Sequence, residues 1–252
     1  WSVEWWIGGE DRWYFPALER TVRQRLEGDA PVVTTAMRCG KGDITHTAWV
    51  VAGHGGSSWL ALRVRNETAA AVAVALAVRP WNPLGRAAVH TVELREQTVW
   101  VDDVAALHLD RVPAECVVGS VDHMVGRDPS AQLAAGRNLH DATSPTSVSD
   151  DRGLASAAVV FPLPHTLSLD VLVPLLTASS GGRRGRSRTA TVPRSVPEPE
   201  RVASGWALQA GNGPRLDVPD SQIASLVAAN RCHLLLAQRG DRVGAPGARL
   251  DE

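Results

Sequence analysis

The fold is decided by residues 32–51, whose sequence is VVTTAMRCGKGDITHTAWVV. Residues 32–37 and 44–51 are rich in valine, threonine and other strand formers, which favours two β-strands. Between them, residues 40–43 are Gly-Lys-Gly-Asp, which is typical of a hairpin turn because glycine and aspartate tolerate positive φ. The stretch therefore predicts an antiparallel β-hairpin.

Strand signals continue after this hairpin. Leu60, Leu62 and Val64 alternate with other residues, the period of two expected of a strand with one buried face. Residues 72–78 are apolar on both faces, so we expect an interior strand covered on both sides. No long helix separates these strands, so the sequence predicts a mainly β fold, with antiparallel sheets packed as a two-sheet sandwich or supersandwich. Further strands are predicted at 88–94, 97–101, 104–109, 115–121, 157–161 and 167–173.

Three segments depart from this pattern. Residues 122–153 predict a long excursion between strands, with a short helix at 130–135. Residues 179–219 are too polar and too rich in proline to bury, which is typical of a linker. Asp220 is a good N-cap, and apolar residues at helical spacing follow it, so we expect a helix at about 221–238. We therefore divide the chain into a β-sandwich domain (1–178), a linker (179–219) and the start of a truncated helical domain (220–252).

The apolar stripe of the predicted helix is wider than one edge of a sandwich usually covers. We expect part of it to be exposed in this chain and to be covered by further helices of an (α/α)6 barrel that this sequence lacks. Neither end of the sequence closes a recognisable element, so we expect the chain to be a fragment of a longer protein.

Composition and charge exclude several classes of partner. Lys and Arg number 26 and Asp and Glu number 27, a net charge of -1, so no global field attracts nucleic acid or an anionic membrane. The longest apolar run, 69–78, is half the roughly 20 residues that a membrane-spanning helix needs. Three widely spaced cysteines predict free thiols in a reducing compartment, and hence a cytoplasmic location. The eight histidines show no metal-ligand spacing, and we expect neither a metal nor a cofactor.

Tryptophan is the most unusual component. The chain has nine Trp, against one Tyr and two Phe, and residues 5–16 (WWIGGEDRWYFP) form the densest aromatic segment. Mixed with charged residues, these indoles suit a sugar-lined cleft or a domain interface. They suit equally an N-terminal strand whose indoles fill the core. The candidate carbohydrate- or domain-contacting residues are Trp5, Trp6, Glu10, Asp11, Arg12, Trp13 and Trp81.

No catalytic residue is assigned. A glycosidase needs two carboxylates facing each other across a sugar. Neighbouring acids occur at 10–11, 102–103 and 150–151, but adjacent residues on a strand point to opposite faces.

Four segments carry a resemblance to a known family, and they are spread in order over nearly the whole chain: 5–13 (WWIGGEDRW), 78–83 (VRPWNP), 160–165 (VFPLPH) and 228–236 (AANRCHLLL). In these segments the chain resembles mainly actinobacterial proteins of a glycogen-debranching, amylo-α-1,6-glucosidase-like family of six-hairpin glycosidases. The resemblance implies an N-terminal β-supersandwich followed by an (α/α)6 barrel that carries the catalytic carboxylates.

The resemblance thus implies a non-catalytic N-terminal accessory domain of a glycoside hydrolase acting on α-glucan or related oligosaccharides. The domain would pack on the barrel of the same protein and shape its active site. Two alternatives remain. One is a free-standing carbohydrate-binding module that uses exposed tryptophans. The other is an aldose-epimerase-like enzyme, which would need a His/Glu pair in a cleft; its candidate histidines are His46, His90, His108 and His165.

Overall fold

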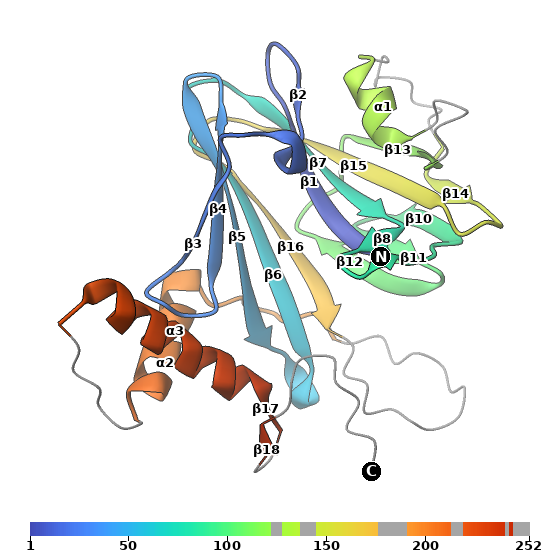
Figure 1. Ribbon diagram of the computed structural model, residues 1–252. Helices are drawn as coiled ribbons and strands as arrows, with labels where there is room; N and C mark the ends of the chain where they lie inside the picture. The colour runs from blue at the N-terminus through green and yellow to red at the C-terminus, as the bar shows by residue number, and fades with distance from the viewer. Residues whose placement is uncertain (122–127, 137–144, 176–190, 213–218, 240–241, 244–252) are drawn as a thin grey trace.

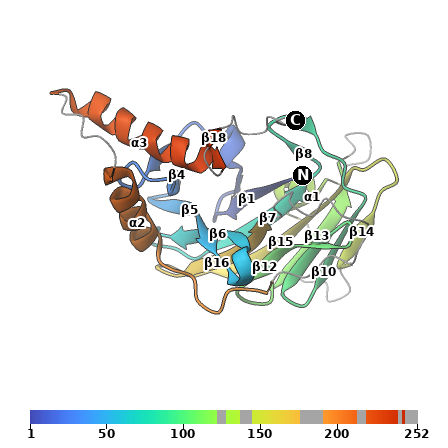
Figure 2. The same ribbon diagram turned by 90° about the horizontal axis from the view of Figure 1, so that it is seen from below.

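The computed structural model describes residues 1–121, 128–136, 145–175, 191–212, 219–239 and 242–243. Two antiparallel sheets face each other, and two helices lie at one end of the larger sheet (Figures 1 and 2). The expected mainly β fold built of antiparallel sheets is confirmed.

The smaller sheet has the strand order β13-β15-β7-β1-β2. Its members are β1 (Ser2–Gly8), β2 (Trp13–Tyr14), β7 (Val72–Arg79), β13 (Glu115–Ser120) and β15 (Ala155–Leu163). The larger sheet has the order β14-β10-β11-β12-β16-β6-β5-β4-β3. Its members are β3 (Arg23–Leu26), β4 (Val33–Cys39), β5 (Gly42–Ala52), β6 (Ser58–Asn66), β10 (Thr91–Arg95), β11 (Thr98–Val101), β12 (Val104–Leu109), β14 (Ser147–Ser149) and β16 (Ser168–Leu175).

Strand β7 shows why the sheets pack as they do. Its valines and Leu76 face the other sheet and belong to the main core, while Ala73, Ala75 and Ala77 face the outer side. The outer face is covered by Trp6 and by Leu133 of the short helix α1 (Pro129–Ala134). The prediction of an interior strand covered on both sides is therefore confirmed.

The hairpin predicted from residues 32–51 is present as β4 and β5, paired antiparallel from Val33–Ala48 to Cys39–Gly42. The short helix predicted at 130–135 is also present, because Asp128 caps α1 by accepting a hydrogen bond from the Ser130 amide (2.8 Å). The excursion contains a strand that the sequence did not predict, β14, which pairs with β10. Residues 122–127 and 137–144 of the excursion lie outside the described residues.

The expectation of an unburied linker is wrong for its described central part. Helix α2 (Pro199–Gly211) lies there, with proline at its first turn. Val196 and Val202 pack against the buried cluster that contains Trp49 and Trp59, on the outer face of the larger sheet. Within α2 itself, Val202 and Ala203 are the residues that pack against this cluster. The face of β6 that carries Trp59 and Ala61 is consequently buried as well as the core face that carries Leu62, where one buried face was expected.

Helix α3 (Ser221–Ala237) agrees with the helix predicted at 221–238, and Asp220 caps it through the amides of Gln222 and Ile223. It packs against α2 and contacts the β3–β4 turn, where Ser225 hydrogen-bonds Asp29. That α3 also begins a further helical domain stays a prediction. The remaining elements are the 3-10 turns η1 (Pro16–Leu18) and η2 (His54–Gly56) and the short hairpin strands β8 (Trp81–Asn82), β9 (Gly85–Arg86), β17 (Gln238–Arg239) and β18 (Arg242–Val243).

Candidate functional site

The tryptophan-rich segment divides between the two faces of β1. Trp5 points toward the larger sheet, where its ring stacks on His46 of β5 with centroids 5.3 Å apart and planes 6° apart. Trp6 points to the outer side and is 2% exposed, packed edge to face against Phe15. Trp6 is therefore buried and Trp5 is half-buried against the main core, so both indoles serve packing.

Glu4 joins Trp6 to Trp81. One carboxylate oxygen accepts the Trp6 indole N–H (3.0 Å), and the other accepts the Trp81 indole N–H (2.9 Å). The Arg79 guanidinium lies 5.2 Å from the Trp6 ring centre and 4.3 Å from that of Trp81. These contacts use both indole donors and one ring face of each indole.

Arg79 is itself buried, at 4% exposure, and makes a two-pronged ion pair with Asp128 (2.7 and 2.8 Å). Its guanidinium also donates to the Ser156 hydroxyl (3.1 Å). Burial alone would raise the pKa of Asp128, but the hydrogen bonds and charge of Arg79 outweigh it and lower that pKa. Arg79 thus links β7, β15 and the N-cap of α1, a role that the sequence did not reveal.

The remaining candidates lie on the β1–β2 turn. Arg12 forms a two-pronged ion pair with Glu19 (2.6 and 3.0 Å), and its guanidinium lies 3.9 Å from the centre of the Tyr14 ring. The Tyr14 hydroxyl lies 2.9 Å from both carboxylate oxygens of Asp11, and this hydrogen bond lowers the pKa of Asp11. Trp13 is half-buried against the cluster that contains Trp6.

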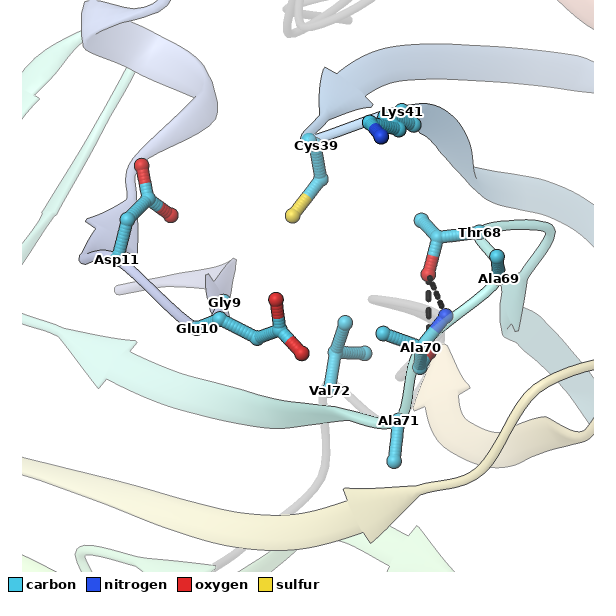
Figure 3. Close-up of a pocket in the computed structure, with 11 residues that line it drawn as sticks. Gly9, Glu10, Asp11, Cys39, Lys41, Thr68, Ala69, Ala70, Ala71 and Val72 are labelled. Carbon is cyan, nitrogen blue, oxygen red and sulfur yellow. Dashed lines mark hydrogen bonds between the residues drawn. The ribbon is translucent and has the colours of Figure 1, made fainter.

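Glu10 and Asp11 border a cavity of about 390 Å³ at one end of the sandwich (Figure 3). The β1–β2 turn, the β4–β5 turn and the β6–β7 loop meet there, and we call it the end pocket. Figure 3 shows the Glu10 carboxylate and the Cys39 sulfur pointing into the same space. The end pocket is lined by Gly9, Glu10, Asp11, Cys39, Gly40, Lys41, Thr68, Ala69, Ala70, Ala71 and Val72.

The β6–β7 wall of the end pocket is fixed by the fully buried side chain of Asn66. Its amide group donates to the carbonyls of Ala70 (2.7 Å) and Leu163 (2.9 Å), and its oxygen accepts from the amide (2.9 Å) and hydroxyl (2.8 Å) of Thr68. With every polar group of Asn66 satisfied, this wall is preorganised.

Cys39 forms part of the pocket floor. Burial raises the pKa of its thiol, and the charge of Asp11 acts in the same direction. The thiol is therefore neutral at physiological pH and contributes a small apolar surface, because the thiolate is the nucleophilic form.

A second cavity, of about 190 Å³, lies on the outer face of the larger sheet between β12, β16 and residues 192–196. Asp110 and Asp170 meet there across the two strands, with the Asp170 amide donating to Asp110 (3.1 Å). Arg63 holds Asp170 through two hydrogen bonds (2.7 and 2.8 Å), whereas burial raises the pKa of Asp110 and lowers that of the neighbouring His108.

Among the four histidines proposed for an epimerase-like site, His108 is the one that lies beside acidic side chains in this second cavity. His46 stacks on Trp5, and His165 contacts the Thr68 carbonyl. His90 is exposed. The acids beside His108 are aspartates, so the second cavity does not contain the His/Glu pair that an epimerase-like enzyme would need.

Helices α2 and α3 present an apolar surface that the sequence analysis had expected in part. Ile223, Leu226, Leu234 and Leu236 of α3 are about half exposed or more, and Leu208 of α2 is 75% exposed. A groove between the helices is lined by Val202, Gly205, Trp206, Gln209, Leu235 and Gln238. We call these two helices with their groove the helical surface. The expectation that part of the α3 stripe is exposed is confirmed.

Within the described residues, no group of three or more His, Cys, Asp or Glu is arranged to hold a metal ion. Among the same residues, none of the helices combines the length and apolar character that crossing a lipid bilayer requires. Comparison with protein-family models gives no match, and comparison with curated proteins gives none either.

Proposed function

We propose that this chain is an N-terminal, non-catalytic accessory domain of a glycoside hydrolase acting on α-glucan or related oligosaccharides, and that it packs on a catalytic helical barrel through the helical surface. The observation that carries the proposal is the composition of α3. Eleven of the 17 residues in Ser221–Ala237 are apolar, and the polar ones are Ser221, Gln222, Ser225, Asn230, Arg231 and His233. The apolar stripe of a helix is normally buried. Here Leu226 and Leu234 are 61% and 57% exposed.

The nature of the partner comes from the resemblance. Residues 228–236, one of the segments similar to the debranching family, lie within α3. In that family an (α/α)6 barrel follows the β-supersandwich. Helix packing on helix would bury the exposed leucines, and each fully buried leucine contributes roughly 2 kcal/mol relative to an exposed one.

The alternative, a carbohydrate-binding module with tryptophan platforms, has less support. Trp1 is the one exposed tryptophan among the nine, at 38%. A sugar-binding platform needs a free indole face, whereas Trp6 and Trp81 share the Arg79 guanidinium and Trp5 is stacked on His46.

Hydrogen exchange tests the docking. Amides of 221–237 should exchange fast in this chain alone and become strongly protected in the longer protein that contains the barrel. Leu226→Lys should abolish the gain in protection, while Leu18→Lys, at an exposed leucine outside the helical surface, should not. Strong protection in the isolated monomer would contradict the proposal.

Two assays test the biochemical part. The isolated chain should not hydrolyse maltooligosaccharides, glycogen or aryl glucosides; turnover abolished by replacing one acid within the chain would show it to be an enzyme. Saturable quenching of tryptophan fluorescence by glucans, lost in Trp1→Ala, would instead favour the binding module.

A further inference from the structure

Two oppositely charged side chains line the end pocket without pairing. Glu10 lies on the β1–β2 turn and Lys41 on the β4–β5 turn, and both are exposed. Within the described part of the chain, no hydrogen bond or ion pair engages either side chain. Neighbouring arginines behave differently, since Arg12, Arg23 and Arg38 each lie within ion-pair distance of an acid.

Lys41 is also the only lysine in the chain, and the other 25 of its 26 Lys and Arg residues are arginines. An ammonium group is a compact charge with three donors, suited to a single carboxylate group on a small ligand. Because Lys41 has no counterpart elsewhere in the sequence, a label attached to lysine side chains reports only on the rim of the end pocket.

The walls that carry these two charges are fixed relative to each other. A Cβ added at Gly42 would lie 2.4 Å from the Thr68 Cα, so the β4–β5 turn and the β6–β7 loop are in close backbone contact. A Cβ added at Gly9 would lie 2.9 Å from the Tyr14 ring and 3.3 Å from the Cys39 sulfur, which fixes the third wall. A ligand held between Glu10 and Lys41 would therefore meet a preformed site.

The floor between the charges is aliphatic. Val72, Ala70, Ala71 and the neutral Cys39 thiol line it, and none of the lining residues is aromatic. This composition lacks the indole or phenol platform on which a sugar ring stacks. The volume of about 390 Å³ lies in the lower part of the range for small-molecule sites, which suits a ligand of modest size.

We propose that the end pocket binds a small zwitterion of the amino acid or dipeptide class. The ligand's ammonium group pairs with Glu10, and the fixed Asp11 carboxylate adds negative potential on the same side. Its carboxylate pairs with Lys41, and its aliphatic part packs on Val72 and Ala71. The inference does not depend on the proposed function, because the helical surface lies at the other end of the larger sheet from the β4–β5 turn (Figure 1).

Binding is tested with glycyl-L-alanine as the probe, on the whole chain with Lys41 converted to its ¹³C-dimethylammonium form, which keeps the charge. Because Lys41 is the only lysine, one side-chain signal reports on the end pocket. That signal and the amide signals of Gly40 and Gly42 should shift saturably at millimolar probe. N-acetylglycyl-alanine, without the ammonium group, and glycyl-alanine amide, without the carboxylate, should each bind about tenfold more weakly or worse.

Variants supply the second arm. Glu10→Gln and Lys41→Met should each weaken binding by about tenfold, whereas Lys41→Arg should retain most of it. Glu200→Gln, at an exposed acid on α2, is the matched control and should leave affinity unchanged. The proposal is overturned if no probe shifts these signals, if the two neutralised analogues bind as well as the zwitterion, or if maltose binds in preference.

Discussion

Lowering the pH from 7 to 5 should destabilise the folded chain, with His46 as a main source of the loss. His46 lies on the face of β5 that carries Ile44, and its ring stacks on Trp5. Burial lowers its pKa from 6.5 to about 4. The unfolded chain therefore binds more protons than the folded chain between about pH 4 and pH 6.5, and the free energy of unfolding falls as the pH falls through that window.

The size of the effect follows from the two pKa values. A shift of one unit corresponds to about 1.4 kcal/mol, so the whole window amounts to roughly 3 kcal/mol. About 2 kcal/mol of this develops between pH 7 and pH 5. Carboxylates act at lower pH than His46. The Arg12 ion pair lowers the pKa of Glu19, so it stabilises the folded chain above pH 4.5, the pKa of Glu19 in the unfolded chain. This stabilisation is lost as the pH falls through and below 4.5.

Urea unfolding followed by circular dichroism at pH 5, 6 and 7 measures the effect. His46→Phe keeps a ring against Trp5 and removes the titrating group, so its free energy of unfolding should lose about 2 kcal/mol of pH dependence. His108→Phe measures the contribution of the second histidine whose pKa burial lowers. His90→Gln, at an exposed position, controls for deleting a histidine. The reasoning is refuted if His46→Phe keeps the pH dependence of the parent chain.

Four further substitutions test the packing. Arg79→Met should cost about 3 kcal/mol or more in urea unfolding, because it leaves a half-buried carboxylate without its partner. Gly42→Ala should lower the free energy of unfolding by about 1–3 kcal/mol and shift the NMR signals of the end-pocket amides, because the new Cβ would lie 2.4 Å from the Thr68 Cα. Gly205→Ala places its Cβ in open space and should stabilise α2 by about 0.5–1 kcal/mol. Trp49→Phe removes the indole hydrogen bond to the Pro197 carbonyl (3.0 Å) and should cost about 1 kcal/mol and speed proteolysis at the start of α2.

The sequence predicted the parts of the fold that depend on local pattern. The period-two alternation and the doubly apolar run at 72–78 specified strands, and Asp220 specified the start of α3. Helix α2 was missed because proline and charge at 193–201 dominate the composition, while the apolar contacts of Val196 and Val202 depend on a sheet surface formed by distant residues. Strand order could not be predicted either, because β16 pairs with both β6 and β12 across long intervals of sequence.

The candidate site was predicted less completely. Glu10 and Asp11 do border a cavity, but its other walls come from Cys39, Lys41 and the 68–72 loop, which convergence of three turns brings together. The signal available in the sequence was the single lysine within a glycine turn. Arg79 carried no such signal, since its role depends on Asp128, which lies 49 positions along the chain.

A side chain can bind a ligand or a partner only if one of its faces, or its hydrogen-bonding group, is not already occupied within the chain. Trp6 and Trp81 do not meet this condition, whereas Glu10 and Lys41 do. Glu4 accepts both indole donors of Trp6 and Trp81, and Arg79 lies against both rings, so their aromatic surface is committed to joining β1, β7 and α1. These two tryptophans therefore serve packing rather than recognition. Glu10 and Lys41 make no hydrogen bond or ion pair within the described part of the chain, and Leu226 and Leu234 of α3 are exposed, so recognition is expected to use these groups.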